Sequence, residues 1–198
     1  AGIKSDFING LRVTDEKSID IVVEVLNNFN KEITEALKKN SCNSQAITNN
    51  QNNILMVEQE DQGLGFVGTP KKISQSIIEQ IVKEKKVPVI APLGLDKNNQ
   101  VFNINADTAA GAIAKKLNAR RLIIMSDVEG VLDNDKKLIS EINTNKINEL
   151  IRNETISGGM IPKINNCLDV ASNGVKGVCI IDGRLNHSIL FELLSDKG

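Results

Sequence analysis

Short apolar runs alternate with polar turns and helical patterns along the chain, which predicts an α/β protein. Residues 87–93 and 121–125 have the length and polar flanks of strands that are covered on both faces of a parallel sheet. Residues 177–181 form the last clear strand. Apolar residues recur at helical spacing after Ser74 and Thr144, so we expect helices that begin at those two residues.

The first third of the chain is less regular. Residues 7–13 are extended, and Thr14 is placed to cap a helix with apolar residues at helical spacing. We expect that helix to break at residues 27–30 and to be followed by a second helical segment. Residues 40–53 are rich in Asn, Gln and Ser, which predicts a polar loop before a strand at residues 54–57.

Composition narrows the function classes. A chain of 198 residues can bury a sizeable core. Its net charge of -1 and aromatic content of 3% give neither the basic field nor the rings that nucleic-acid binding needs. No apolar run is long enough to cross a bilayer, and no basic segment followed by an apolar one opens the chain. We therefore expect no membrane span, no secretory signal and no nucleic-acid partner.

Cysteine and histidine usage adds two expectations. Cys42, Cys167 and Cys179 are odd in number and widely spaced, which predicts reduced thiols in a reducing compartment. His187 is the only histidine, so a histidine metal site or a Ser-His-Asp triad would have no second histidine to draw on. We expect no protein-built metal site and a structural role for His187.

The most informative stretch is a strand that runs directly into a helix of small residues. Residues 101–104 are extended, and Asp107 stands where the helix begins. The turn therefore carries Asn103, Asn105 and Asp107, and turns of this kind line the ligand crevice of open α/β sheets. The alternative is structural: Asp107 caps its helix, and the asparagines only make the turn.

A glycine pair ahead of another helix predicts an anion site. Gly158 and Gly159 precede Met160, and Pro162 suits the first helical turn, where no N–H donor is needed. Backbone N–H groups beside glycines can approach an anion, and Lys163 adds a positive charge in the same turn. A phosphate site is the functional interpretation, and a flexible surface loop is the alternative.

Two further positions place polar groups where a ligand can bind. Arg12 precedes a helix start, and its guanidinium can grip a carboxylate with two hydrogen bonds. Its alternative is a surface ion pair with Asp15 or Glu16. Ser126 and Asp127 follow a buried strand and so lie in ligand position as well.

Five segments taken together resemble the N-acetylglutamate kinases, a branch of the amino acid kinase family. They are residues 9–14, 63–68, 103–107, 126–131 and 158–163. Each is weak alone, but they stand in the same order, and the resemblance extends from about Phe7 to the last residue. It implies phosphorylation of the side-chain carboxylate of N-acetyl-L-glutamate, the second step of arginine biosynthesis, with ATP and Mg²⁺ as cofactors.

The resemblance also implies a role for each candidate residue. Lys163 would stabilise the transferred phosphoryl group as a catalytic residue, and Asp107 would orient the lysines. The residues implied to bind N-acetylglutamate are Arg12, Asn103 and Asn105. The residues implied to bind the nucleotide are Ser126, Asp127, Gly158, Gly159 and Met160. Mg²⁺ would bridge the phosphates and would not occupy a protein cage.

Regulation and assembly follow from the same resemblance. In arginine-inhibited members the segment similar to residues 187–198 lines an effector pocket, which implies Glu192 and Gly198 as effector contacts. Relatives form homodimers through the first lobe, and some form homohexamers. Plastid and cyanobacterial relatives bind the PII signalling protein. The implied location is bacterial cytoplasm or plastid stroma.

The expected fold is a three-layer α/β/α sandwich with a mainly parallel open sheet that two lobes share. Residues 1–118 would form the lobe for N-acetylglutamate binding and dimerisation, and residues 119–198 the nucleotide-binding lobe. Relatives begin with a strand that ends in a lysine and paired glycines, and this chain starts downstream of both. We therefore expect a sequence truncated at its N-terminus and slightly at its C-terminus, with weak or no turnover alone.

One departure from the family and two other functions stay open at this point. At residues 46–53 relatives carry a glycine-rich turn that this sequence lacks, so no role of that turn is carried over. One alternative is another kinase of the same fold, acting on aspartate, glutamate, carbamate or a nucleotide. The other is a non-catalytic amino-acid-sensing module. The missing N-terminal lysine favours a non-catalytic module, and the retention of Arg12, Asp107 and Lys163 argues against it.

Overall fold

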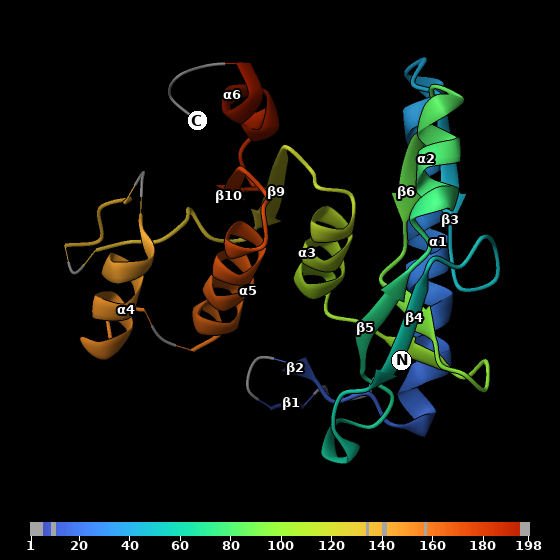
Figure 1. Ribbon diagram of the computed structural model, residues 1–198, viewed down its shortest axis with the longest axis horizontal. Helices are drawn as coiled ribbons and strands as arrows, with labels where there is room; N and C mark the ends of the chain where they lie inside the picture. Colours follow the sequence, from blue (N-terminus) through green and yellow to red (C-terminus); the bar gives the residue numbers. More distant parts are fainter. Residues whose placement is uncertain (1–5, 9–10, 134, 140–141, 157, 195–198) are drawn as a thin grey trace. The chain divides into compact units, whose positions relative to one another are not determined.

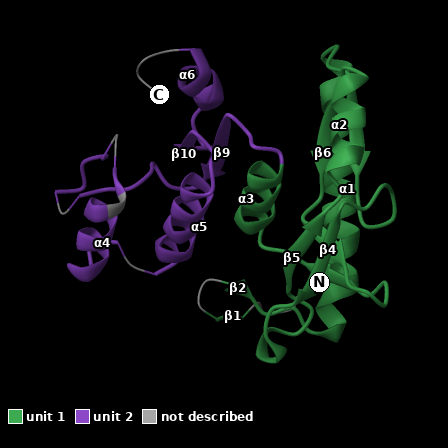
Figure 2. Cartoon of the chain, in the orientation of Figure 1, with its two compact units in different colours: residues 1–116 green, residues 117–198 purple. Residues whose placement is uncertain are grey.

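The structure is a computed structural model that describes residues 6–8, 11–133, 135–139, 142–156 and 158–194 (Figure 1). The chain divides into two compact units, residues 1–116 (unit 1) and 117–198 (unit 2), shown in Figure 2. Each unit combines helices with a parallel strand pair, which confirms the predicted α/β class. The three-layer arrangement and the roles of the two lobes stay predictions.

The described strands of unit 1 form three sheets. β1 (Phe7–Ile8) and β2 (Leu11–Arg12) are antiparallel, and β3 (Ser44–Ile47) and β6 (Val87–Ile90) are parallel. The third sheet has the order β5 (Gly68–Ile73), β4 (Leu55–Gln59), β7 (Leu93–Leu95), β8 (Val101–Asn103). In it β4 pairs in parallel with β7, and the two other pairs are antiparallel.

The helices of unit 1 pack against these strands. α1 (Glu16–Lys39) contacts β3, β6 and β8, α2 (Gln75–Lys83) contacts β6, and α3 (Ala106–Lys116) contacts β5. A 3-10 turn spans Gln62–Leu64. The largest fully buried apolar side chains are those of Ile47, Ile54, Leu55, Leu93 and Ile104. Ile104 directly follows β8, so the core of unit 1 includes a residue of the 103–107 turn.

Unit 2 is built around the parallel pair β9 (Arg121–Ser126) and β10 (Gly177–Asp182). α5 (Met160–Ser172) and α6 (Ser188–Leu194) contact β10, and α4 (Thr144–Arg152) contacts α5. Its buried cluster consists of Val131, Ile147, Leu150, Ile156 and Ile164. The parallel pairing places the carboxyl ends of β9 and β10 at one edge.

The start of α1 corrects a prediction. Asp15, and not Thr14, is the N-cap, because the Asp15 side chain accepts a hydrogen bond from the Ser18 N–H at 2.9 Å. Thr14 lies one residue earlier and is fully buried. Its hydroxyl bonds instead to the Arg12 carbonyl oxygen and to the Asn103 side chain.

The predicted break at residues 27–30 is also wrong, because α1 continues through it. The Asn30 side chain finds partners outside the helix. Its Nδ2 donates to the carbonyl oxygens of Val89 at 2.8 Å and Ile47 at 3.5 Å, the first on β6 and the second at the end of β3. Tertiary contacts thus engage the Nδ2 of a helix-weakening residue, while its Oδ1 is buried without a hydrogen-bond partner in the described part of the chain.

Three smaller predictions are corrected as well. The expected polar loop at residues 40–53 contains strand β3. The apolar run at residues 87–93 divides into β6 and β7. α4 is capped by Asn143, and not by Thr144, since the Asn143 side chain accepts from the Lys146 N–H at 2.9 Å.

Candidate functional site

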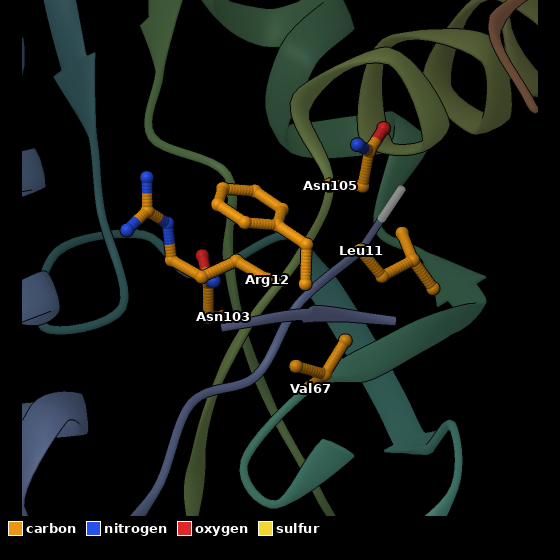
Figure 3. A pocket seen from close by; sticks show the side chains of 6 residues that line it. Leu11, Arg12, Val67, Asn103 and Asn105 are labelled. Carbon is orange, nitrogen blue, oxygen red and sulfur yellow. The ribbon is translucent and has the colours of Figure 1, made fainter. Parts of the chain in front are cut away.

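Three predicted substrate-binding residues line one cavity in unit 1. Its volume is about 200 Å³, and its lining consists of Phe7, Leu11, Arg12, Val67, Asn103 and Asn105 (Figure 3). The asparagines and the arginine come from segments that lie far apart in the sequence. The cavity therefore combines one positive charge and two amides with an apolar wall.

Arg12 supplies the charge. It is exposed at the end of β2, and the β1–β2 pairing sets Phe7 opposite to it. The Cζ atom of Arg12 lies 4.9 Å from the centroid of the Phe7 ring, which is a cation–π contact. The short hairpin thus keeps a guanidinium at the cavity, where it can bind a carboxylate.

Asn103 is held through both its backbone and its side chain. Its N–H donates to the Phe66 carbonyl at 2.9 Å, and Asn103 forms a parallel bridge with Val67. Its side-chain Nδ2 donates to the Thr14 hydroxyl oxygen at 3.2 Å. The amide is therefore fixed at the cavity wall before any ligand binds.

The 63–68 segment reaches the site because of one glycine. Gly65 has φ 70°, and a Cβ atom at this position would lie 2.3 Å from the carbonyl oxygen of Thr14. Thr14 donates its N–H to the Leu64 carbonyl at 3.0 Å and accepts from the Phe66 N–H at 2.7 Å. Only glycine lets the loop close this tightly against Thr14.

The 103–107 turn divides its roles between two residues. Asn105 occupies the cap position of α3, since its Oδ1 accepts from the Thr108 N–H at 3.0 Å and hydroxyl at 3.2 Å. Asp107 is half-buried in the first turn of α3, where the helix dipole favours a carboxylate. Asn105 therefore has a structural role besides lining the cavity, and the catalytic role of Asp107 stays a prediction.

In unit 2 the edge formed by β9 and β10 carries polar residues. Ser126 pairs in register with Asp182, and the Ser126 carbonyl accepts from the Gly183 N–H at 2.7 Å. The Ser126 hydroxyl lies 3.4 Å from Oδ1 of Asp127. Ser126 and Asp127, two of the five predicted nucleotide-binding residues, thus stand at the carboxyl end of β9, as the sequence pattern predicted.

Asp182 and Arg184 form an ion pair that the sequence analysis missed. Arg184 Nε and Nη2 donate to the two carboxylate oxygens of Asp182 at 2.9 and 2.7 Å. These hydrogen bonds lower the pKa of the Asp182 carboxyl below its ordinary value of 3.8 and raise the pKa of Arg184. The available signal was an acidic and a basic residue flanking a glycine at a strand end.

The predicted phosphate site lies at the start of α5. Gly158 has φ 57°, and Gly159 holds the N-cap position without a side chain that could cap the helix. A Cβ atom at either glycine would meet nothing within 4 Å. Lys163 is half-buried in the same turn, whereas Ser157 lies outside the described residues. Open space at uncapped amides suits an anion, and the nucleotide role of Gly158, Gly159 and Met160 stays a prediction.

The predicted effector residue Glu192 is engaged within unit 2. Arg121 Nη1 donates to its Oε1 at 3.1 Å and to its backbone carbonyl at 3.0 Å. Burial, together with a hydrogen bond to Glu192, raises the pKa of Cys179 to about 12. Gly198 lies outside the described residues. The effector role of Glu192 stays a prediction: loss of arginine inhibition in Glu192→Ala would support it, and unchanged inhibition would contradict it.

The described part of the chain has neither a metal-binding cluster nor a membrane-spanning helix. No group of three or more His, Cys, Asp and Glu side chains there is able to hold a metal ion. No described helix has the length and apolar character needed to cross a bilayer.

Comparison with known proteins points to one family. The model of the amino acid kinase family matches residues 1–182. The acetylglutamate kinase of Pelagibacter ubique is 68% identical over 99% of this chain and 68% of its own length, and that of Campylobacter fetus is 45% identical over 99% and 71%. The crystal structure of smu.665 from Streptococcus mutans has a TM-score of 0.85 and 32% identity, covering 91% of this chain and 74% of that one.

Proposed function

The chain belongs to the amino acid kinase family, and from that premise we propose that it transfers the γ-phosphoryl group of ATP to the side-chain carboxylate of N-acetyl-L-glutamate. The product is an acyl phosphate, and the reaction is the second step of arginine biosynthesis. Relatives named acetylglutamate kinase, matched over almost the whole chain, support this assignment. The observation that carries it is the cavity lined by Arg12, Asn103 and Asn105.

The chemistry of the cavity suits N-acetylglutamate. The Arg12 guanidinium can bind the carboxylate that is not phosphorylated, through charge-assisted hydrogen bonds. The Asn103 amide can both donate and accept, as the acetamido group requires, and Asn105, whose Oδ1 already accepts from Thr108, can donate through Nδ2. Leu11 and Val67 provide apolar surface for the acetyl methyl group.

Residues of unit 2 would bind the nucleotide. Gly158 and Gly159 directly precede α5, and the space where their Cβ atoms would lie is open, so a phosphate can approach the backbone N–H groups at the start of this helix. Ser126 and Asp127 offer polar groups at the end of β9. We assign ATP to these residues and N-acetylglutamate to the cavity of unit 1.

Phosphoryl transfer here needs charge neutralisation more than proton transfer. A carboxylate oxygen of the substrate attacks the γ-phosphorus, a new P–O bond forms, and the bond to the bridging oxygen of the departing ADP breaks. The carboxylate is already ionised at neutral pH, so no general base is required. Lys163 supplies positive charge to the phosphates, and Asp107 keeps the orienting role that the family resemblance implies. Magnesium enters as part of the Mg-ATP substrate.

Trapping of the acyl phosphate with hydroxylamine tests the proposal. Purified protein is incubated with Mg-ATP and either N-acetylglutamate, glutamate, aspartate or carbamate, and hydroxamate or ADP is measured. We expect slow product formation with N-acetylglutamate, in line with the weak turnover expected of this chain alone, and at most a small fraction of that rate with free glutamate. Preferred turnover of another acid would identify a different kinase of the family. Binding of N-acetylglutamate without turnover would fit a truncated enzyme or a sensing module, and the same assay on a protein extended upstream of Ala1 would separate the two.

We further propose that the protein is a homodimer that acts in a bacterial cytoplasm. Its named relatives are bacterial. α1 exposes a line of apolar side chains spaced four residues apart, Ile21, Val25, Phe29 and Ile33. A ridge of this kind along a helix favours packing against a second copy.

A further inference from the structure

We propose that Thr14 is a positioning residue for substrate binding: its hydroxyl fixes which end of the Asn103 amide faces the cavity. The inference rests on the proposed function of unit 1. Thr14 is not among the residues that line the cavity. It therefore acts on the substrate only through Asn103 and the backbone of Arg12.

The position of Thr14 is set by its backbone. The residue is 0% exposed, and it forms a parallel bridge with Gly65. Its N–H donates to the Leu64 carbonyl at 3.0 Å, and its carbonyl accepts from the Phe66 N–H at 2.7 Å. Both backbone groups are used, so the side chain emerges from a fixed point between the Arg12 and Asn103 segments.

The proton of the hydroxyl decides the orientation of the amide. Thr14 Oγ1 donates to the Arg12 carbonyl oxygen at 3.3 Å. A hydroxyl has one proton, so toward Asn103 it can only accept. Asn103 must therefore present Nδ2, which donates to Thr14 Oγ1 at 3.2 Å. Its Oδ1 is directed away from Thr14 and, with the second amide proton, is left for a ligand.

Shape alone cannot impose this choice. The two ends of an asparagine amide are nearly the same size, so only hydrogen-bond partners distinguish one orientation from its flipped form. N-acetylglutamate offers carboxylate and acetamido oxygens as acceptors and its acetamido N–H as a donor. A flipped Asn103 would exchange donor and acceptor against these groups. Because the Thr14 hydroxyl holds the Asn103 amide in one orientation before binding, no binding free energy is spent on reorienting that amide.

Two substitutions separate the hydroxyl from the shape of the side chain. Thr14→Val keeps the volume and removes the hydroxyl, while Thr14→Ser keeps the hydroxyl. Calorimetry should give a dissociation constant for N-acetylglutamate that is about tenfold higher in Thr14→Val and within about twofold of wild type in Thr14→Ser. Affinity for ATP should not change in either variant. Wild-type affinity for N-acetylglutamate in Thr14→Val would overturn the proposal.

A double substitution tests whether the effect passes through Asn103. In an Asn103→Ala background, Thr14→Val should change the affinity for N-acetylglutamate by less than about twofold, because the amide that it positions is already gone. Equal losses in the two backgrounds would overturn the assignment to Asn103. Thermal unfolding of each variant confirms that the compared proteins are folded.

A measurement made without substrate tests the positioning of Asn103 independently of the proposed function. Nuclear magnetic resonance of the Asn103 side-chain NH₂ group should show one proton shifted and slowly exchanging in wild type and Thr14→Ser, and not in Thr14→Val. If wild type binds no N-acetylglutamate, the proposed function fails, while these amide signals still test the positioning. Identical Asn103 amide signals in wild type and Thr14→Val would overturn it.

Discussion

Gly65 sets the geometry of the candidate site by lacking a side chain. Its backbone has φ 70°, and the Thr14 carbonyl oxygen occupies the space where a Cβ atom would be. The bridge between Thr14 and Gly65 joins the Arg12 strand to the loop that contacts Asn103. A side chain at residue 65 would therefore displace both the Arg12 strand and the loop that contacts Asn103.

Gly65→Ala is expected to lower the free energy of unfolding by about 2 kcal/mol or more, since it adds both an unfavourable φ and a backbone clash. Chemical denaturation measures the effect. Gly159→Ala is the matched control, because Gly159 has φ -66 and open space around it. It should change stability by less than about 1 kcal/mol. Equal effects of the two substitutions would contradict this account of Gly65.

The lowered pKa of Asp182 predicts that the protein loses stability in acid. Its pKa is depressed by hydrogen bonds from Arg184, so its contribution is fully present above the ordinary pKa of 3.8 and is lost as pH falls through the lower folded value. Between pH 6 and pH 3, the melting temperature of Asp182→Asn should therefore fall less steeply than that of wild type. Parallel curves for the two proteins would show that the ion pair adds nothing.

At the scale of elements, the Asn30 amide links α1 to two parallel strands, beside the Ser44 hydroxyl of β3, which donates to the Thr34 carbonyl at 2.9 Å. Asn30 is 3% exposed and donates to carbonyls of Val89 and Ile47.

Asn30→Ala removes the 2.8 Å hydrogen bond to the Val89 carbonyl, which should cost about 1–3 kcal/mol of unfolding free energy, while the Ile47 carbonyl still accepts from the Ala91 N–H at 2.9 Å. Asn28→Ala, exposed on the same helix, should cost less than about 0.5 kcal/mol. Denaturation curves compare them, and similar losses would refute the role of Asn30.

The elements that sequence could predict are those with local signals. Strands β9 and β10 and the helix after Gly159 follow from apolar runs and from helix-start chemistry, although both strands are only partly buried. The continuity of α1 could not be predicted, because the partners of Asn30 lie 17 and 59 residues away. Tertiary contacts there override the weak helix propensity of asparagine.

The site likewise contains residues that a local sequence motif reveals and one residue that only long-range contacts place. Arg12, Asn103 and Asn105 belong to short motifs, so sequence could name them before their shared cavity was seen. Thr14 could not be placed, because its contact with Asn103 spans 89 residues and depends on how the loop at Gly65 closes. The sequence signal at Thr14 favoured a helix cap, and the residue that fills that position is Asp15.

At the scale of the molecule, the proposed homodimer depends on the apolar ridge of α1. Wild type should have twice the 21.6 kDa mass of one chain by light scattering. Phe29→Glu places a charge on a ridge residue that is 57% exposed, and it should halve that mass. Asn28→Glu adds the same charge beside the ridge and should leave the dimer intact. A monomeric wild type would contradict the proposal.

The most direct test of the central claim is the steady-state kinetics of Arg12→Ala and Lys163→Ala with Mg-ATP and N-acetylglutamate. Arg12→Ala should raise KM for N-acetylglutamate by about 10-fold to 100-fold and leave KM for ATP unchanged, because a charge-assisted carboxylate contact is lost. Lys163→Ala should lower kcat by about 10²-fold to 10³-fold. An unchanged KM for N-acetylglutamate in Arg12→Ala would contradict the assignment of the unit 1 cavity to this substrate.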